Sequence, residues 1–216
     1  VIRLDMSCGG ATPEELNSYL DDAFYKYEQK YEVAVRPEAS LAVRFQNIIE
    51  TMFQKTGKQA VILIDEYDSP LQHSWKTPQH DACTAIYKSV FAVLKKEDEH
   101  ERFVFITGIT KFSQLSIFSE LNNLDNISMF DQYSAICGIS KKELTTQMKP
   151  DIEALGEDLG MTYEECLAEL TRFYDGYHFS KKSEDVFNPF SLVKALNARD
   201  IAPYWFGSGT PSFLLK

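Results

Sequence analysis

The stretch AVILIDE, residues 60–66, decides the expected fold, because five apolar residues run unbroken into two acidic ones. A continuous aliphatic and β-branched run of this length predicts a strand with both faces buried, which is typical of a parallel sheet covered by helices on both sides. Two further apolar stretches, residues 1–6 and 102–107, predict strands before and after it in the chain. Strands with long connections between them favour an α/β fold.

Helical patterns fill the connections between these strands. A complete helix start with a capping box at residues 12–15 predicts a helix to about residue 31. A second helix is expected over residues 40–57 and a third over residues 81–96. The resulting order of strand, two helices, strand, helix and strand is that of βαβ units in a parallel sheet.

The pattern changes after about residue 130. Two more capping boxes, at residues 140–143 and 162–165, and an Asn-Pro helix start at residues 188–189 predict mainly helical structure. We therefore expect a core domain over residues 1–130 and a helical region over residues 131–216.

Composition excludes several classes of protein. A chain of 216 residues with a formal net charge of −10 does not suit a surface devoted to nucleic-acid phosphates. Four widely separated cysteines lack metal-binding spacing and are typical of reduced thiols in a cytoplasmic protein. No apolar run approaches the roughly 20 residues that a membrane span needs.

Asp65 and Glu66 fall at the carboxyl end of an expected parallel strand, where ligands bind in open α/β sheets. Adjacent carboxylates repel each other unless a cation or a hydrogen-bond donor offsets the cost. In P-loop NTPases an acid at such a strand end holds Mg²⁺, and a second acid can polarise the attacking water. An acidic pair can equally begin a solvated loop, so the pair alone leaves both interpretations open.

Hydroxyl groups and an ammonium group follow the next expected strand. Thr107, Thr110 and Lys111 stand in the string TGITK. A hydroxyl at this place can orient a water or touch a γ-phosphate, and Lys111 can neutralise phosphate charge. The alternative is a plain turn at Gly108 with Lys111 in solvent.

These residues belong to longer strings that resemble the bacterial AAA-ATPase-like proteins, relatives of the archaeal-type ATPases in the P-loop superfamily. The strings are VILIDEYDSPL (61–71), FITGITKFSQLSIFSELNNL (105–124), YDGYHFS (174–180), VFNPFSLV (186–193) and YWFGSGTPSFLLK (204–216). The resemblance implies a P-loop NTPase-like core with a parallel sheet, incomplete at its N-terminus and followed by a helical lid. It also implies ATP and Mg²⁺ as ligands.

The resemblance implies a role for each candidate residue. Asp65 would contact Mg²⁺ and Glu66 would be the catalytic base of a Walker B motif. Thr107 would take the sensor position, with Thr110 and Lys111 close behind it. Members of the family often carry a nuclease domain farther toward the C-terminus, so an attached nuclease or effector domain is an expected partner.

One departure from the family pattern concerns the phosphate-binding loop. No GxxxxGK[ST] sequence occurs in these residues, and the resemblance places it before the strand at residues 1–6. It also places a missing strand between residues 60–64 and 102–107, which would otherwise pair directly or leave a gap. Since the loop supplies most of the phosphate grip, we expect this polypeptide alone to bind ATP poorly.

Three functions compete on these grounds. The first is an ATPase module whose nucleotide state moves the lid and regulates an attached domain. The second is a degenerate nucleotide-binding or scaffold domain without turnover. The third is a metal-dependent hydrolase that uses Asp65, Glu66 and Asp68 directly on a substrate such as nucleic acid. The aromatic strings near residues 174–179 and 204–206 favour core packing over base stacking, so direct nucleic-acid binding is not supported.

Overall fold

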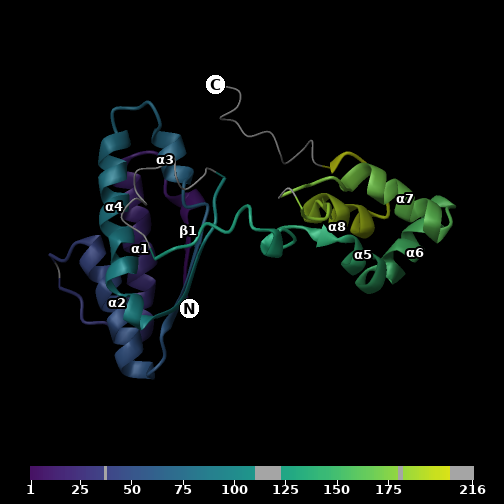
Figure 1. The fold of residues 1–216 in the computed structure, drawn as a ribbon. Coiled ribbons are helices and arrows are strands. Elements are labelled where there is room, and N and C mark those ends of the chain that lie inside the picture. Colours follow the sequence, from purple (N-terminus) through teal and green to yellow (C-terminus); the bar gives the residue numbers. More distant parts are fainter. Residues whose placement is uncertain (37, 110–122, 180–181, 205–216) are drawn as a thin grey trace. The chain divides into compact units, whose positions relative to one another are not determined.

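The computed structural model describes residues 1–36, 38–109, 123–179 and 182–204. The chain divides into two compact units, Val1–Asp125 (unit 1) and Asn126–Lys216 (unit 2). Figure 1 shows each unit with its own helices and strands. We describe the two units separately.

Unit 1 contains a three-stranded parallel sheet in the order β1-β2-β3. Its strands are β1 (Ile2–Asp5), β2 (Ala60–Asp65) and β3 (Glu101–Ile106), its α-helices are α1 (Pro13–Tyr31), α2 (Leu41–Thr56), α3 (Ser69–Ser74) and α4 (His80–Lys96), and its short 3-10 turns are Met6–Cys8 and Asp98–His100. The α/β class with a parallel sheet is therefore confirmed.

Local sequence signals set the ends of α1 and α2. The Thr12 hydroxyl accepts from the amide of Glu15, and the Glu15 carboxylate accepts from the amide of Thr12, which completes the capping box. Ser40 caps the start of α2, and Gly57 ends it with a φ of 65°, a conformation that glycine adopts without strain. Both helices follow the sequence prediction closely.

Helix α3 is an element that the sequence analysis missed. Pro70 lies within the first turn of this helix. Proline is tolerated there because the amides of the first helical turn have no partner within the helix.

Strands β2 and β3 pair directly with each other. The pairing runs from Ala60 opposite Glu101 to Ile64 opposite Ile106, and the register shifts once, between Ala60 and Val61. Of the two alternatives expected for strands that lack the family's intervening strand, direct pairing is observed. The free side of β3 is the edge at which the described sheet ends.

One face of the sheet packs against the helices. Ile2, Leu4, Ile62 and Ile64 are at most 2% exposed. They share a hydrophobic core with the buried faces of α1, α2 and α4, which lie together on one side of the sheet in Figure 1. This core fixes the sheet firmly from one side.

The other face of the sheet is more exposed. Val61 and Leu63 are half-buried, and Phe103 is 54% exposed. Parallel crossovers are right-handed, so two successive crossovers that step in the same direction place their helices on the same face. The expectation that helices cover both faces is thus not met within the described residues, because the order β1-β2-β3 steps only one way.

Unit 2 is mainly helical, as predicted, and adds a small antiparallel strand pair. Its elements are a 3-10 turn (Asp131–Tyr133), β4 (Ile139–Ser140), α5 (Lys141–Gln147), α6 (Lys149–Leu159), α7 (Tyr163–Tyr174), β5 (Val186–Phe187) and α8 (Pro189–Ala198). Both predicted capping boxes form, at Ser140 with Glu143 and at Thr162 with Glu165. None of the helices within the described residues of the chain combines the length and apolarity that a bilayer span requires.

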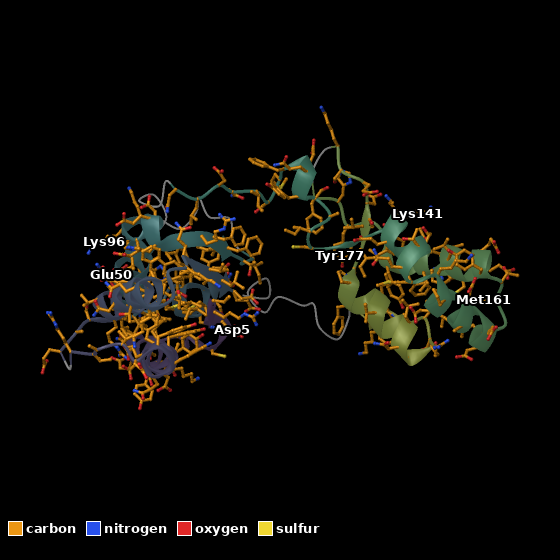
Figure 2. The ribbon with its side chains drawn as sticks, turned by 90° about the horizontal axis from the view of Figure 1, so that it is seen from below. Asp5, Glu50, Lys96, Lys141, Met161 and Tyr177 are labelled. Carbon is orange, nitrogen blue, oxygen red and sulfur yellow. The ribbon has the colours of Figure 1, made fainter. Side chains whose placement is uncertain are left out.

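The aromatic string at residues 174–179 divides between core and surface. Tyr174 is buried, and its hydroxyl donates to the carbonyl of Ala202 at 2.8 Å and accepts from the amide of the same residue at 3.0 Å. Tyr177 is 45% exposed and is labelled on the surface of unit 2 in Figure 2. Trp205 and Phe206 lie outside the described residues.

Candidate functional site

The three parallel strands of unit 1 end at one edge, and polar side chains follow them there. Asp5 ends β1 and stands in register with Asp65, which ends β2. Thr107 follows β3, and its amide donates to the carbonyl of Ile64 at 2.8 Å. Asp5, labelled in Figure 2, and Asp65 are both exposed and alternate with buried neighbours, so both belong to the open face of the sheet.

A hydrogen bond across the strands joins two of the predicted site residues. The Thr107 hydroxyl donates to Oδ1 of Asp65. The amide of Glu66 donates to the same oxygen at 3.0 Å. The other oxygen, Oδ2, accepts no hydrogen bond from the described residues. The structure thus brings Asp65 and Thr107 together and leaves one carboxylate oxygen available to a ligand.

Glu66 departs from the strand in an unusual conformation. Its φ is 45°, in the left-handed region, which costs a non-glycine residue about 1 to 2 kcal/mol. Its carbonyl accepts from the amide of Ser69 at 2.9 Å, which closes the turn into α3. The side chain of Glu66 is exposed, as is that of Asp65. Backbone strain of this kind is concentrated at functional sites.

Asp68 behaves differently from the two acids before it. It is only 1% exposed, so its carboxylate is part of the interior of unit 1. This burial counts against Asp68 as a third acid acting on a substrate beside Asp65 and Glu66. Sequence position alone could not separate these roles, because all three acids stand in the same short string.

Tyr67 packs beneath the same turn. It is 3% exposed, and its amide donates to the carbonyl of Thr107 at 3.0 Å. Burial raises the pKa of its phenol, and the neighbouring Asp68 carboxylate raises it further. The Tyr67 ring is therefore neutral and serves as packing between the ends of β2 and β3.

Sequence analysis missed Asp5 as a site residue. Only the register of β1 against β2 places it beside Asp65. Its Oδ1 accepts from the amide of Ser7 at 3.1 Å and from the Ser7 hydroxyl at 2.6 Å. The signal in the sequence is the same as for Asp65, an acid at the end of an apolar strand.

Two predicted residues, Thr110 and Lys111, lie outside the described residues, so nothing is added to their expected roles. Two open hollows of about 490 and 850 Å³ in unit 1 are lined by residues of α1, α2, α4 and the loop before α2. In the larger one Arg44 is already paired, with Glu28 at 2.7 Å and with Asp21. Neither hollow is lined by the strand-end acids.

The side-chain oxygens at the strand ends are suited to a hard cation. Carboxylate and hydroxyl oxygens are the ligands that Mg²⁺ prefers, and Mg²⁺ commonly takes one or two carboxylates and completes its shell with water and phosphate. The described part of the chain holds no group of three or more His, Cys, Asp or Glu residues able to bind a metal. A Mg²⁺ ion at Asp65 would therefore depend on water and phosphate oxygens for most of its ligands.

Comparisons with known proteins show the family of this chain. A protein named "Uncharacterized protein in vnfD 5'region", from Azotobacter chroococcum mcd 1, is 32% identical over 217 residues. The match covers 98% of this chain and 39% of that relative, so the chain spans about two-fifths of the relative's length. No solved structure matches the chain. A family model described as "Predicted AAA-ATPase" matches residues 1–118, which is more than half of the chain. The chain therefore belongs to the predicted AAA-ATPase family.

Proposed function

We propose that this chain forms the acidic, sensor-bearing part of a module that binds and hydrolyses ATP. The observation that supports the proposal best is the hydrogen bond from the Thr107 hydroxyl to Asp65, at the carboxyl ends of neighbouring parallel strands. In P-loop NTPases an acid at such a strand end holds Mg²⁺, and ligands of open α/β sheets bind beyond the carboxyl ends of the strands.

Each residue has a distinct proposed role. Asp65 is the Mg²⁺ contact, because both of its hydrogen-bond donors lie on Oδ1, which leaves Oδ2 available to the ion. Glu66 is the general base, because its exposed carboxylate can take the proton of an attacking water. Thr107 is the sensor, because its hydroxyl couples the end of β3 to Asp65. When bound, Mg²⁺ would neutralise charge on the phosphates.

Thr110 and Lys111 complete the proposal through the family resemblance. Thr110 would contact the nucleotide, and Lys111 would neutralise phosphate charge. Replacing Lys111 with methionine in the full-length protein should weaken ATP binding, and equilibrium titration of labelled ATP would measure the change.

The phosphate grip itself is proposed to come from elsewhere in the intact protein. These 216 residues contain no GxxxxGK[ST] sequence. The resemblance places the strand that carries this loop between β2 and β3, which pair directly here, and we propose that it separates them in the intact protein and brings the loop beside Asp65. The chain alone should then show little affinity for ATP with Mg²⁺. Micromolar binding of labelled ATP to these residues would contradict this part of the proposal.

The proposed output is regulation of an attached domain. Residues 131–216 would act as the lid that responds to nucleotide state, and residues 1–130 as the core. A relative much longer than this chain leaves room for a nuclease or other effector domain in the full-length protein. We propose the bacterial cytoplasm as the compartment, where the four free cysteines stay reduced.

The decisive experiment measures Mg²⁺-dependent ATP hydrolysis by the full-length protein and two variants. Glu66→Gln should lower kcat by about a hundredfold or more while ATP still binds, since a general base contributes 10² to 10⁴ in rate. Asp65→Asn should raise the Mg²⁺ concentration needed for turnover. Asp22→Asn, which changes an exposed acid on α1, is the matched control and should leave both unchanged. Normal turnover by Glu66→Gln would favour the scaffold function instead.

A further inference from the structure

Asp68 is a buried carboxylate that touches both neighbouring strand ends. Its Oδ1 accepts from the amide of Ile109 at 3.3 Å, beyond the end of β3. Its Oδ2 accepts from Nε2 of Gln72 at 2.5 Å, within α3. A carboxylate that is 1% exposed is stable only when such donors replace the water it has lost. Asp68 therefore bridges the turn after β2 and the backbone after β3.

The contact between these two segments is too close for a side chain at position 108. A Cβ atom on Gly108 would stand 2.4 Å from Oδ1 of Asp68 and 2.4 Å from Cε1 of Tyr67. Only glycine fits at position 108. Because glycine has no side chain, the peptide between Gly108 and Ile109 can approach the Asp68 carboxylate closely.

Hydrogen bonds hold the backbone of Thr107 through both its amide and its carbonyl. Its amide donates to the carbonyl of Ile64, and its carbonyl accepts from the amide of Tyr67. Two residues later, Asp68 holds the amide of Ile109. These contacts fix the backbone position of Thr107, and so the place from which its hydroxyl reaches Asp65.

We infer that Asp68 is a positioning residue, which clamps the backbone after β3 to the end of β2 and so holds the Thr107 hydroxyl on Asp65. Its effect on catalysis rests on the proposed ATPase function, whereas the clamp itself does not. Gln72 is the second half of the clamp, because it fixes the carboxylate from α3.

Two substitutions separate geometry from charge at this position. In Asp68→Asn the side-chain carbonyl can still accept from Ile109, and its amide can donate to Gln72 if the Gln72 amide turns over. In Asp68→Ala the hydrogen bonds to Ile109 and Gln72 are lost. A clamp predicts that asparagine substitutes well and alanine badly, whereas a catalytic or metal-binding charge predicts that both fail.

The first readout is hydrogen exchange of the full-length protein, followed by mass spectrometry of peptides that span residues 103–109. Asp68→Ala should speed exchange in these peptides by about tenfold or more, and Asp68→Asn should stay near the parent. Met52→Ala, at a buried position of α2, is the control for general loss of stability. Unchanged exchange in Asp68→Ala would overturn the inference.

The second readout is ATP turnover by the same proteins. Asp68→Ala should lower kcat by about ten- to a hundredfold with an unchanged Kd for ATP, since small displacements of catalytic groups cost that much. Asp68→Asn should remain within about threefold of the parent. Equal losses in both variants would overturn the positioning role. If the parent protein hydrolyses no ATP, the proposed function fails, and the exchange experiment alone decides the clamp.

Discussion

Replacing Glu101 with glutamine should remove most of the decline in stability that we expect as the pH rises from 5 to 9. Glu101 begins β3, and its Oε1 is buried without a hydrogen-bond partner among the described residues. Burial raises the pKa of this carboxyl from its ordinary value of 4.5 to about 8, and the charges of Asp98 and Glu97 add to the rise. At neutral pH the group is therefore protonated in the folded protein.

The sign and size of the effect follow from the two pKa values. The folded protein holds this proton more tightly than the unfolded chain, so the contribution to stability is complete below about pH 4.5 and is lost as the pH rises through about 8. The full difference corresponds to about 5 kcal/mol. Because water reaches part of the side chain, we expect a measured loss of about 2 kcal/mol.

Urea denaturation between pH 5 and pH 9 would test this expectation. The parent should lose about 2 kcal/mol of unfolding free energy across the range through this group, and Glu101→Gln should lack this part of the loss. His100 contributes a decline in the same direction in both proteins, because the Glu97 carboxylate raises the pKa of its imidazole. Glu99→Gln, an exposed neighbouring acid, is the matched control and should follow the parent. A Glu101→Gln variant that declines as steeply as the parent would refute the reasoning.

Three further predictions concern other parts of the structure. Thr107→Val keeps the shape of the side chain but removes the hydroxyl donor to Asp65, so ATP turnover by the full-length protein should fall by about a hundredfold, while Thr107→Ser should retain activity. Gly108→Ala should destabilise unit 1 by about 1 to 3 kcal/mol in chemical denaturation, because the added Cβ meets Tyr67 and Asp68 at 2.4 Å. Gly57→Ala, where nothing lies within 4 Å of the added atom, should cost only about 1 kcal/mol through its positive φ, so equal losses would contradict the overpacking argument. Thr162→Ala should lower the stability of unit 2 by about 1 kcal/mol because the start of α7 loses its cap, and Thr162→Ser should restore it in thermal unfolding.

The elements that sequence predicted well are those that local chemistry determines. The strand Ala60–Asp65 forms because no polar residue interrupts its apolar run, residues 60–64. Helix α1 begins at Pro13 because Thr12 and Glu15 satisfy free amides at its start. By contrast, the strands at Ile139–Ser140 and Val186–Phe187 are two residues long, which is too short to show any periodicity.

The features that sequence could not provide depend on how distant segments meet. Asp5 becomes part of the strand-end group only through its register with Asp65. The burial of Asp68 depends on the close approach of Gly108, which lies 40 positions later in the chain. One face of the sheet is left uncovered by the described helices because successive crossovers step in the same direction, and the apolar residues of β2 do not reveal that direction.

This uncovered face also affects how a preparation of the 216-residue polypeptide should behave. Half-buried Val61 and Leu63 lie on β2, and exposed Phe103 lies on β3, the outer side of which has no partner in the described sheet. An apolar surface beside an open strand edge favours association between molecules. The net charge of −10 opposes that association by repulsion, which dissolved salt screens. Samples should therefore stay dispersed at low ionic strength and grow in apparent mass as salt is added.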